Sequence, residues 1–271
     1  MILANTDATT SAIFRPVCED PRLEVVCVAF TQTLTRANGF WRGVYQIFLA
    51  CGLGYFTYVA FCNIVFRAKE WLLGSLPGMR RLFGAFFSLR LWAREQGIQT
   101  VYSADFNSEG FLQIVRRHRP DVLFTRINQI LREPILSAAS QGCWCFHSSA
   151  LPSYQGIAAE FHSLLNGEGT AGFTVFRMER IVDAGPILAI ETFPVPPGVT
   201  LHGLIEHTIA RSHGVVRRAI EAMLSGEVMP IPQDLSQRSY YSWPNPVQTR
   251  AFRRRGLRYI SMREAFAYVC R

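Results

Sequence analysis

Short runs of apolar and β-branched residues alternate along this chain with segments of helical length. Asp121–Ile127 (DVLFTRI) opens with an uninterrupted apolar run, which is typical of a strand buried on both faces of a parallel sheet. Strands are predicted at Leu23–Phe30, Thr100–Ser103, Asp121–Ile127, Cys143–Phe146, Gly172–Met178 and Ile187–Phe193. Helices are predicted at Val44–Phe66, Leu82–Gln96, Ser108–Arg117, Glu133–Gln141, Ala158–Asn166 and Thr200–Ser225. The alternation predicts an α/β fold with a mostly parallel, Rossmann-like sheet and helices on both faces.

Shifts in composition divide the chain into three parts. Residues 1–22 are mixed and polar, and we interpret them as a loose N-terminal extension. They lack a basic segment followed by an apolar core, so we expect no secretory signal. Residues 23–197 hold the predicted strands and form the expected α/β domain, which ends in a proline-rich boundary at 194–197. Residues 198–271 are expected to form a small, basic C-terminal subdomain.

The charge balance narrows the kind of partner only slightly. Lysine and arginine number 28 against 20 acidic residues, which gives a net charge of +8. That charge suits a phosphate, a folate, a nucleic acid or a membrane surface without choosing among them. Because 49% of the residues are apolar, an acidic disordered chain is excluded. The seven cysteines are too few, and odd in number, for a disulfide scaffold, so we expect a reducing compartment and a cytoplasmic protein.

The segment 44–66 contains no charged residue and is long enough to cross a membrane. Predicted strands lie on both sides of it in the sequence, so a single membrane crossing would separate strands of one sheet. We therefore interpret it as a helix that packs on the sheet or lies in the interface of a homodimer. A membrane span is the less favoured interpretation, and contact with a membrane surface stays open.

Residues 146–188 carry the densest set of chemically useful side chains. His147 directly follows a predicted strand, and Asp183 precedes an Ala-Gly-Pro turn. Sites in α/β sheets lie at the carboxyl ends of strands. A histidine and an aspartate from two loops at that edge can form a general-base pair.

A metal site is not expected here. Cys143, Cys145 and His147 fall on one face of a strand by alternation. Their spacing nevertheless matches no common zinc pattern.

The ordered motifs around these residues resemble the folate-dependent formyltransferase family, whose loop reads Asn-x-His-x-Ser-x-Leu-Pro-x-Tyr-x-Gly. The residues that match the loop are His147, Ser149, Leu151, Pro152, Tyr154 and Gly156. Those that match the following turn are Gly167, Glu168 and Gly172, and those that match the last element are Met178, Asp183, Gly185, Pro186, Ile187 and Leu188. The resemblance covers roughly residues 23–197, most clearly from Pro120 onward, and a long ordered set of this kind is far more specific than a lone glycine motif.

The resemblance implies a formyltransferase fold, an enzyme and a co-substrate, formyl-tetrahydrofolate, with no metal. His147 would transfer a proton or polarise the formyl oxygen, and Asp183 would orient His147 or a relay water. The residues implied in folate binding are Ile127, Gln129, Ile130, Leu131, Ser149 and Val182. The anionic glutamyl tail of the folate suits a basic protein.

One position departs from the family pattern. Cys145 stands where the family has its catalytic asparagine, two residues before the histidine. A thiol is a weaker hydrogen-bond donor than an amide, and losing one oxyanion donor typically costs a factor of about 100 to 1,000. We favour an enzyme that is slow or in which another group, such as Asn128, supplies the donor. A nucleophilic Cys145 and a degenerate site that binds without turnover are the alternatives.

The acceptor of the formyl group is the feature that the sequence constrains least. Basic and aromatic residues interleave in Tyr240–Pro244 and Arg250–Gly256, as in a patch for a phosphate, nucleotide or nucleic acid, or as at the basic end of a domain. Members of the family that act on initiator tRNA carry a β-barrel tail, for which this segment is short. We therefore expect no nucleic acid but a small amine: an amino sugar, an amino acid derivative or a natural-product amine. A formyl-tetrahydrofolate hydrolase and a non-catalytic folate-binding paralogue remain the alternatives.

Overall fold

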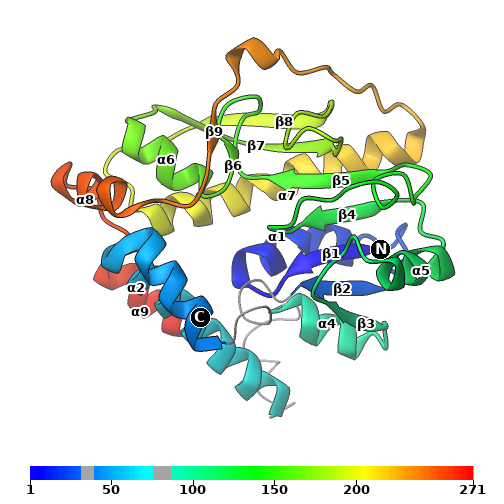
Figure 1. The fold of residues 1–271 in the computed structure, drawn as a ribbon, viewed down its shortest axis with the longest axis horizontal. Helices are drawn as coiled ribbons and strands as arrows, with labels where there is room; N and C mark the ends of the chain where they lie inside the picture. The colour runs from blue at the N-terminus through cyan, green and yellow to red at the C-terminus, as the bar shows by residue number, and fades with distance from the viewer. Residues whose placement is uncertain (32–39, 76–86, 271) are drawn as a thin grey trace.

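The computed structural model describes residues 1–31, 40–75 and 87–270 (Figure 1). The strands of its main sheet are β1 (Ile2–Asn5), β2 (Val28–Thr31), β3 (Thr100–Ser103), β4 (Leu123–Arg126), β5 (Cys143–His147), β7 (Thr170–Arg177) and β8 (Ile187–Pro194). They lie in the order β3-β2-β1-β4-β5-β7-β8. The pairs among β1 to β5 are parallel, whereas β7 and β8 join antiparallel. The prediction of a mostly parallel α/β sheet is confirmed.

The first 22 residues are not a loose extension, and that prediction is wrong. β1 pairs with β2 and β4 in the middle of the sheet, and its four residues are buried. α1 (Ala8–Glu19) follows at once, with the carboxylate of Asp7 accepting the backbone N–H of Thr10 as an N-cap. A strand of four residues is too short to show a periodicity, and the polar residues after it belong to the helix cap.

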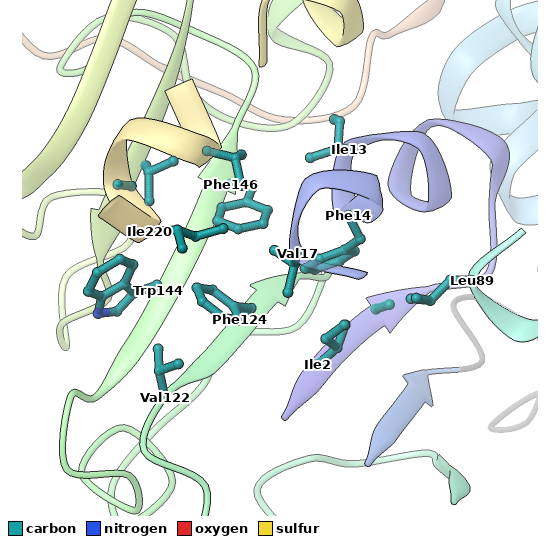
Figure 2. Packing of buried hydrophobic residues seen from close by; sticks show 14 of the residues in the cluster. Ile2, Ile13, Phe14, Val17, Leu89, Val122, Phe124, Trp144, Phe146 and Ile220 are labelled. Atoms are coloured by element: carbon teal, nitrogen blue, oxygen red, sulfur yellow. The ribbon is translucent and has the colours of Figure 1, made fainter. Parts of the chain in front are cut away.

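One face of the sheet is covered by α1, α4 (Leu89–Glu95) and α7 (Leu201–Ser225). Figure 2 shows Phe14 of α1 and Ile220 of α7 beside Phe124, Trp144 and Phe146 of the two central strands. Because α7 packs on β7, β8 and α1, it belongs to the same core as the sheet. The predicted boundary at 197 therefore does not separate two cores.

The other face is covered by α5 (Glu109–His118) and by a series of turns. The helix predicted at Glu133–Gln141 is wrong, since these residues form consecutive turns. Their backbone N–H groups donate to carbonyls three or four residues back, and Gln141 N–H donates instead to Asp121 O at 2.7 Å. Ile135, Leu136 and Ala139 of these turns are buried in the same cluster as α5, so apolar burial was predicted correctly but its backbone form was not.

The remaining elements lie outside the main sheet, with α2, α8 and α9 together at one side of it (Figure 1). They are α2 (Phe40–Ser75), α6 (Ala159–Asn166), α8 (Pro246–Arg254), α9 (Met262–Cys270), the 3-10 turn η2 (Leu235–Gln237) and the short pair β6 (Gln155–Gly156) and β9 (Tyr240–Tyr241). By length and composition alone, residues 48–75 of α2 could cross a membrane. Of the predicted helix Leu82–Gln96, residues 82–86 lie outside the described residues, and the described part is α4.

Three histidines that folding largely removes from solvent make folding stability depend on pH. Burial lowers the pKa of His162, His202 and His213 below the ordinary value of 6.5. The unfolded chain therefore binds protons at pH values where the folded chain does not, so stability is lost as the pH falls below about 6.5. Urea unfolding at about pH 7.5 and about pH 5.5 should give a smaller free energy of unfolding at the lower pH.

His213→Gln provides the matched comparison for this pH dependence. His213 Nε2 donates to Ala12 O at 2.9 Å, and a glutamine amide can donate in the same way without titrating. We expect a smaller difference in stability between the two pH values in this variant. An equal difference in both proteins would contradict the assignment for His213.

Candidate active site

A single cleft of about 1680 Å³ lies at the carboxyl ends of β4 and β5. Such edges are where ligands bind in parallel α/β sheets. Its floor includes the loop after β1, the loop 127–131 and the turn 179–183, and its opposite wall is formed by α2 and α9. The sequence-predicted residues that the cleft brings together are His147, Asp183, Cys145, Asn128, Ile127, Gln129, Ile130, Leu131 and Val182. The cleft exceeds the roughly 300–1,000 Å³ of a single small-molecule site, so it has room for two ligands.

The hydrogen bond of His147 defines which ring nitrogen can act. His147 ends β5, and its Nε2 lies 2.8 Å from Tyr154 O. A carbonyl oxygen can only accept, so Nε2 carries the proton and Nδ1 of the neutral ring carries the lone pair. Nδ1 is thus the atom that can take a proton.

Asp183 stands opposite that nitrogen. Its Oδ2 lies 3.9 Å from His147 Nδ1, too far for a direct hydrogen bond but near enough to stabilise a positive charge on the ring. The same oxygen accepts Gly156 N–H at 2.7 Å. The pair therefore has the arrangement of a general base and the group that stabilises its protonated form.

The turn that carries Asp183 is tied down from two sides. Asp183 has a positive φ of 51°, a conformation that aspartate tolerates better than most residues. Its carbonyl accepts from the side-chain amides of Gln155 and Gln233, both at 3.0 Å. Gln233 also donates to Gly185 O at 2.6 Å. The C-terminal segment thus fixes a carboxylate that is 50 residues away in sequence.

Gly156 is required where β6 meets β9. Its φ is 92°, and a Cβ at this position would lie 2.1 Å from Tyr241 O. We expect Gly156→Ala to lower the free energy of unfolding by about 1–3 kcal/mol. Turnover should fall as well, because Gly156 N–H holds Asp183. Urea unfolding measures the first effect.

Gly167→Ala is the matched control for this substitution. Gly167 also has a positive φ, of 77°, but a Cβ there meets nothing within 4 Å. The difference between the two variants isolates the clash with Tyr241 from the cost of the backbone conformation. Equal losses in both variants would show that the close approach at Gly156 carries no penalty.

Cys145 lies at the cleft in the middle of β5, buried against Phe176, Leu151 and Ile187. Burial, and then the charge of Asp183, raises the pKa of its thiol to about 12. The thiol is therefore protonated near neutral pH, which opposes the nucleophile interpretation because only the thiolate attacks. A protonated thiol can still act as a weak hydrogen-bond donor.

The loop 127–131 lines the cleft, but its side chains differ in what they are free to do. Gln129 donates to Thr31 Oγ1 and Ala104 O and accepts Phe106 N–H, all within 2.8–3.0 Å. It therefore joins the end of β2 to the loops after β3 and β4. Asn128 is exposed at the cleft, as its proposed role as an alternative donor requires. Leu131 is buried.

Ser149 is the predicted site residue that does not line the cleft. It is buried, and its hydroxyl donates to Ser153 O at 2.7 Å. Its carbonyl accepts from Thr174 Oγ1 at 2.6 Å. In this structure Ser149 holds the 149–153 loop beneath the site.

Two features of the site were not predicted as such from the sequence. Arg126 donates to Phe146 O at 2.7 Å and Ser148 Oγ at 3.0 Å, and so joins the ends of β4 and β5 at the cleft. Residues of α2 form a wall of the cleft. The buried side of that helix has helical spacing that the sequence already displays, at Tyr55, Tyr58, Cys62 and Phe66.

Comparison with known proteins gives one family match. Residues 95–220 match the family model described as formyl transferase. The methionyl-tRNA formyltransferase of Thermotoga neapolitana is 31% identical over 153 residues, or 56% of this chain and 49% of that protein. The enzyme of the same name from Thermobifida fusca is 31% identical over 149 residues, or 55% and 48%. The chain spans about half the length of these curated relatives.

Solved structures share the fold over a longer stretch. WlaRD, a sugar 3N-formyl transferase solved with dTDP and 5-N-formyl-THF, has a TM-score of 0.56 at 15% identity and covers 89% of this chain and 68% of its own. Glycinamide ribonucleotide transformylase 1 of Symbiobacterium toebii has a TM-score of 0.56 at 19% identity, with 86% and 92% covered. At these identities the likeness establishes the fold.

Proposed function

Because the chain belongs, through residues 95–220, to the folate-dependent formyltransferase family, we propose that it moves a formyl group from formyl-tetrahydrofolate to the amine of a small-molecule acceptor. One observation carries the proposal. His147 presents Nδ1 as a base, with Asp183 Oδ2 at 3.9 Å, in a cleft large enough for a donor and an acceptor.

Formyl transfer needs a group that both takes and returns a proton. The amine must lose a proton as its N–C bond forms, and the departing pterin nitrogen must gain one as its C–N bond breaks. His147 Nδ1 can accept the first proton and donate it to the leaving nitrogen, so the protein gains none over the cycle. Asp183 stabilises the charge that the ring carries between these two transfers.

The formyl oxygen needs a donor when it gains negative charge. The thiol of Cys145 lies at the cleft but donates weakly. We propose that Asn128, exposed at the same cleft, supplies a second donor beside that thiol. In this proposal the proton transfers and the hydrogen bonds to the formyl oxygen come from side chains of this chain, without a metal.

The donor suits the floor of the cleft. The loop 127–131 and Val182 offer backbone groups and apolar side chains beside His147, which is what a flat, polar-edged pterin ring requires. A net charge of +8 suits the anionic glutamyl tail. WlaRD, which shares this fold, was solved with 5-N-formyl-THF.

A small acceptor is supported by the wall of the cleft. α2 and α9 close the side opposite the sheet. The fold also aligns over most of the chain with a sugar formyl transferase and a glycinamide ribonucleotide transformylase. The seven cysteines are unpaired, which suits the reducing cytoplasm in which we propose that the reaction takes place.

A single-turnover assay tests the proposal. Formyl-tetrahydrofolate is mixed with excess protein, with and without amino sugars, nucleotide-linked amino sugars and amino acid derivatives, and tetrahydrofolate release is followed. Release that an amine accelerates supports the transferase. Release that ignores every amine would make the protein a hydrolase, and donor binding without release would make it a binding protein.

A further inference from the structure

The side of α2 that faces away from the sheet is apolar and exposed. Leu53 and Trp71 are 64% and 71% exposed and do not line the cleft. Leu53 and Trp71 are separated by 18 positions, or about 27 Å along a helix. Exposed side chains of this size, gathered along one helix, indicate an interaction surface rather than ordinary surface scatter.

α9 carries a second stripe of the same kind. Met262, Phe266 and Val269 are all exposed, Phe266 at 72%, and their spacing places them on one face of the helix. The opposite side of α9 contacts α2, where Tyr268 OH donates to Cys62 O at 3.2 Å and Lys69 Nζ donates to Tyr268 O. We call the exposed sides of these two helices the α2–α9 face.

Positive charge borders the α2–α9 face. α8 packs against α2, since a Cβ on Gly52 would lie 3.1 Å from Thr249 Oγ1. α8 exposes Arg250, Arg253 and Arg254 to solvent. Arg255, Arg258 and Arg263 are also exposed between α8 and the first turn of α9.

The carboxylates of the same elements are not exposed to solvent. Among the described residues of α2, α8 and α9 the carboxylates are Glu70 and Glu264. Glu70 is buried and pairs with Arg67 and Arg90 at 3.2 Å and 2.8 Å. Glu264 accepts from Thr200 Oγ1 and Ser261 N–H. The rim of the face is therefore basic and presents no exposed carboxylate within the part of these helices that is described.

We propose that the α2–α9 face docks onto an anionic lipid bilayer, with α2 lying along the membrane surface and the arginines of α8 among the headgroups. Apolar and aromatic side chains beside arginines are the composition of helices that lie in the membrane interface. The cleft lies on the other side of α2, so docking would place the active site within one helix diameter of the headgroups.

Two other occupants fit the same face less well. In a two-fold dimer the α2–α9 face would pair with the same face of a second copy. The basic rims of the two copies would then be brought together, and their arginines would repel. A membrane span would expose the inner side of α2 to lipid. That side is already buried, with Cys51, Tyr55 and Tyr58 packed against Phe161 and Phe252.

Flotation with lipid vesicles tests the docking and needs no turnover. The full chain is mixed with vesicles of phosphatidylcholine alone or with about a quarter phosphatidylglycerol. We expect binding to the anionic vesicles that weakens as salt is added. Leu53→Asp combined with Trp71→Asp should abolish it. Arg253→Gln combined with Arg254→Gln should weaken partitioning about 25-fold, at about five-fold per arginine.

A matched double variant on the far side of the molecule controls for the loss of two positive charges. Arg116→Gln combined with Arg117→Gln changes two exposed arginines on α5, away from α2 and α8 (Figure 1), and should bind like the unchanged chain. If the α2 variant does not fold, Phe266→Asp combined with Val269→Asp tests the same face from α9.

Four results would overturn the proposal. They are no binding by the folded chain, equal binding to neutral and anionic vesicles, and resistance to alkaline carbonate, which marks a spanning helix. The fourth is a dimer in light scattering that binds no vesicle and that the Leu53→Asp, Trp71→Asp variant dissociates, because it would assign the face to a second copy.

Discussion

His147→Ala is expected to lower kcat for formyl transfer by a factor of about 100 to 10,000, the usual contribution of a positioned general acid–base group. The ring is fixed by its bond to Tyr154 O, which leaves Nδ1 as the proton acceptor, and Asp183 faces that atom. Alanine removes the acceptor and leaves the loop 127–131, the proposed donor subsite, in place. The dissociation constant for formyl-tetrahydrofolate should therefore change little while kcat falls.

His213→Ala is the matched control for this result. His213 also donates Nε2–H to a backbone carbonyl, that of Ala12, but it is only partly buried and does not line the cleft. It should keep its kcat and lose only stability. A His147→Ala enzyme with unchanged kcat would remove His147 from the proton transfers, whatever the control shows.

Cys145→Asn is expected to raise kcat by a factor of up to about 100 to 1,000, the usual worth of one oxyanion donor. The thiol at this position is protonated, because burial raises its pKa to about 12, and a neutral thiol donates weakly. The amide would replace it at the cleft with the group that the family motif carries there. The larger side chain must fit among Phe176, Leu151 and Ile187, so some stability should be lost.

Two smaller substitutions at the same position separate donor strength from packing. Cys145→Ser supplies a better donor of similar size and should increase kcat less than asparagine does. Cys145→Ala removes the donor and should not increase kcat. Equal rates in all three variants, with folding verified by circular dichroism, would place position 145 outside the region that the formyl oxygen occupies and leave the role to Asn128.

The fold was predictable where the signal is local or repeated. Thr100–Ser103 forms β3 as predicted, and the helix predicted at Ala158–Asn166 forms α6 from Ala159. The pairing of His147 with Asp183 was predicted, but not its geometry: β7 runs antiparallel to β5 and ends beside Trp144, so Asp183 approaches His147 through the turn that follows β7. Local apolar pattern and turn residues were sufficient for these elements.

The remaining parts depend on contacts that are distant in sequence. β1 is too short to display a pattern, and its place in the centre of the sheet follows from pairing with β2 and β4. The tautomer of His147 follows from the position of Tyr154, whose backbone N–H donates to Ser239 Oγ, 85 residues away. The apolar run 44–66 indicates a helix that other parts of a protein cover. Which side of α2 lines the cleft is distinguished only by its packing in the structure.

The fate of the formyl carbon is the most direct test of formyl transfer to an amine. Donor carrying a labelled formyl group is turned over with an accepted amine, and the label is located in the products. We predict label in the N-formyl product, in equal amount to the tetrahydrofolate released, and loss of that product in His147→Ala. Label recovered as formate, with the amine present and bound, would contradict formyl transfer as the function of this site.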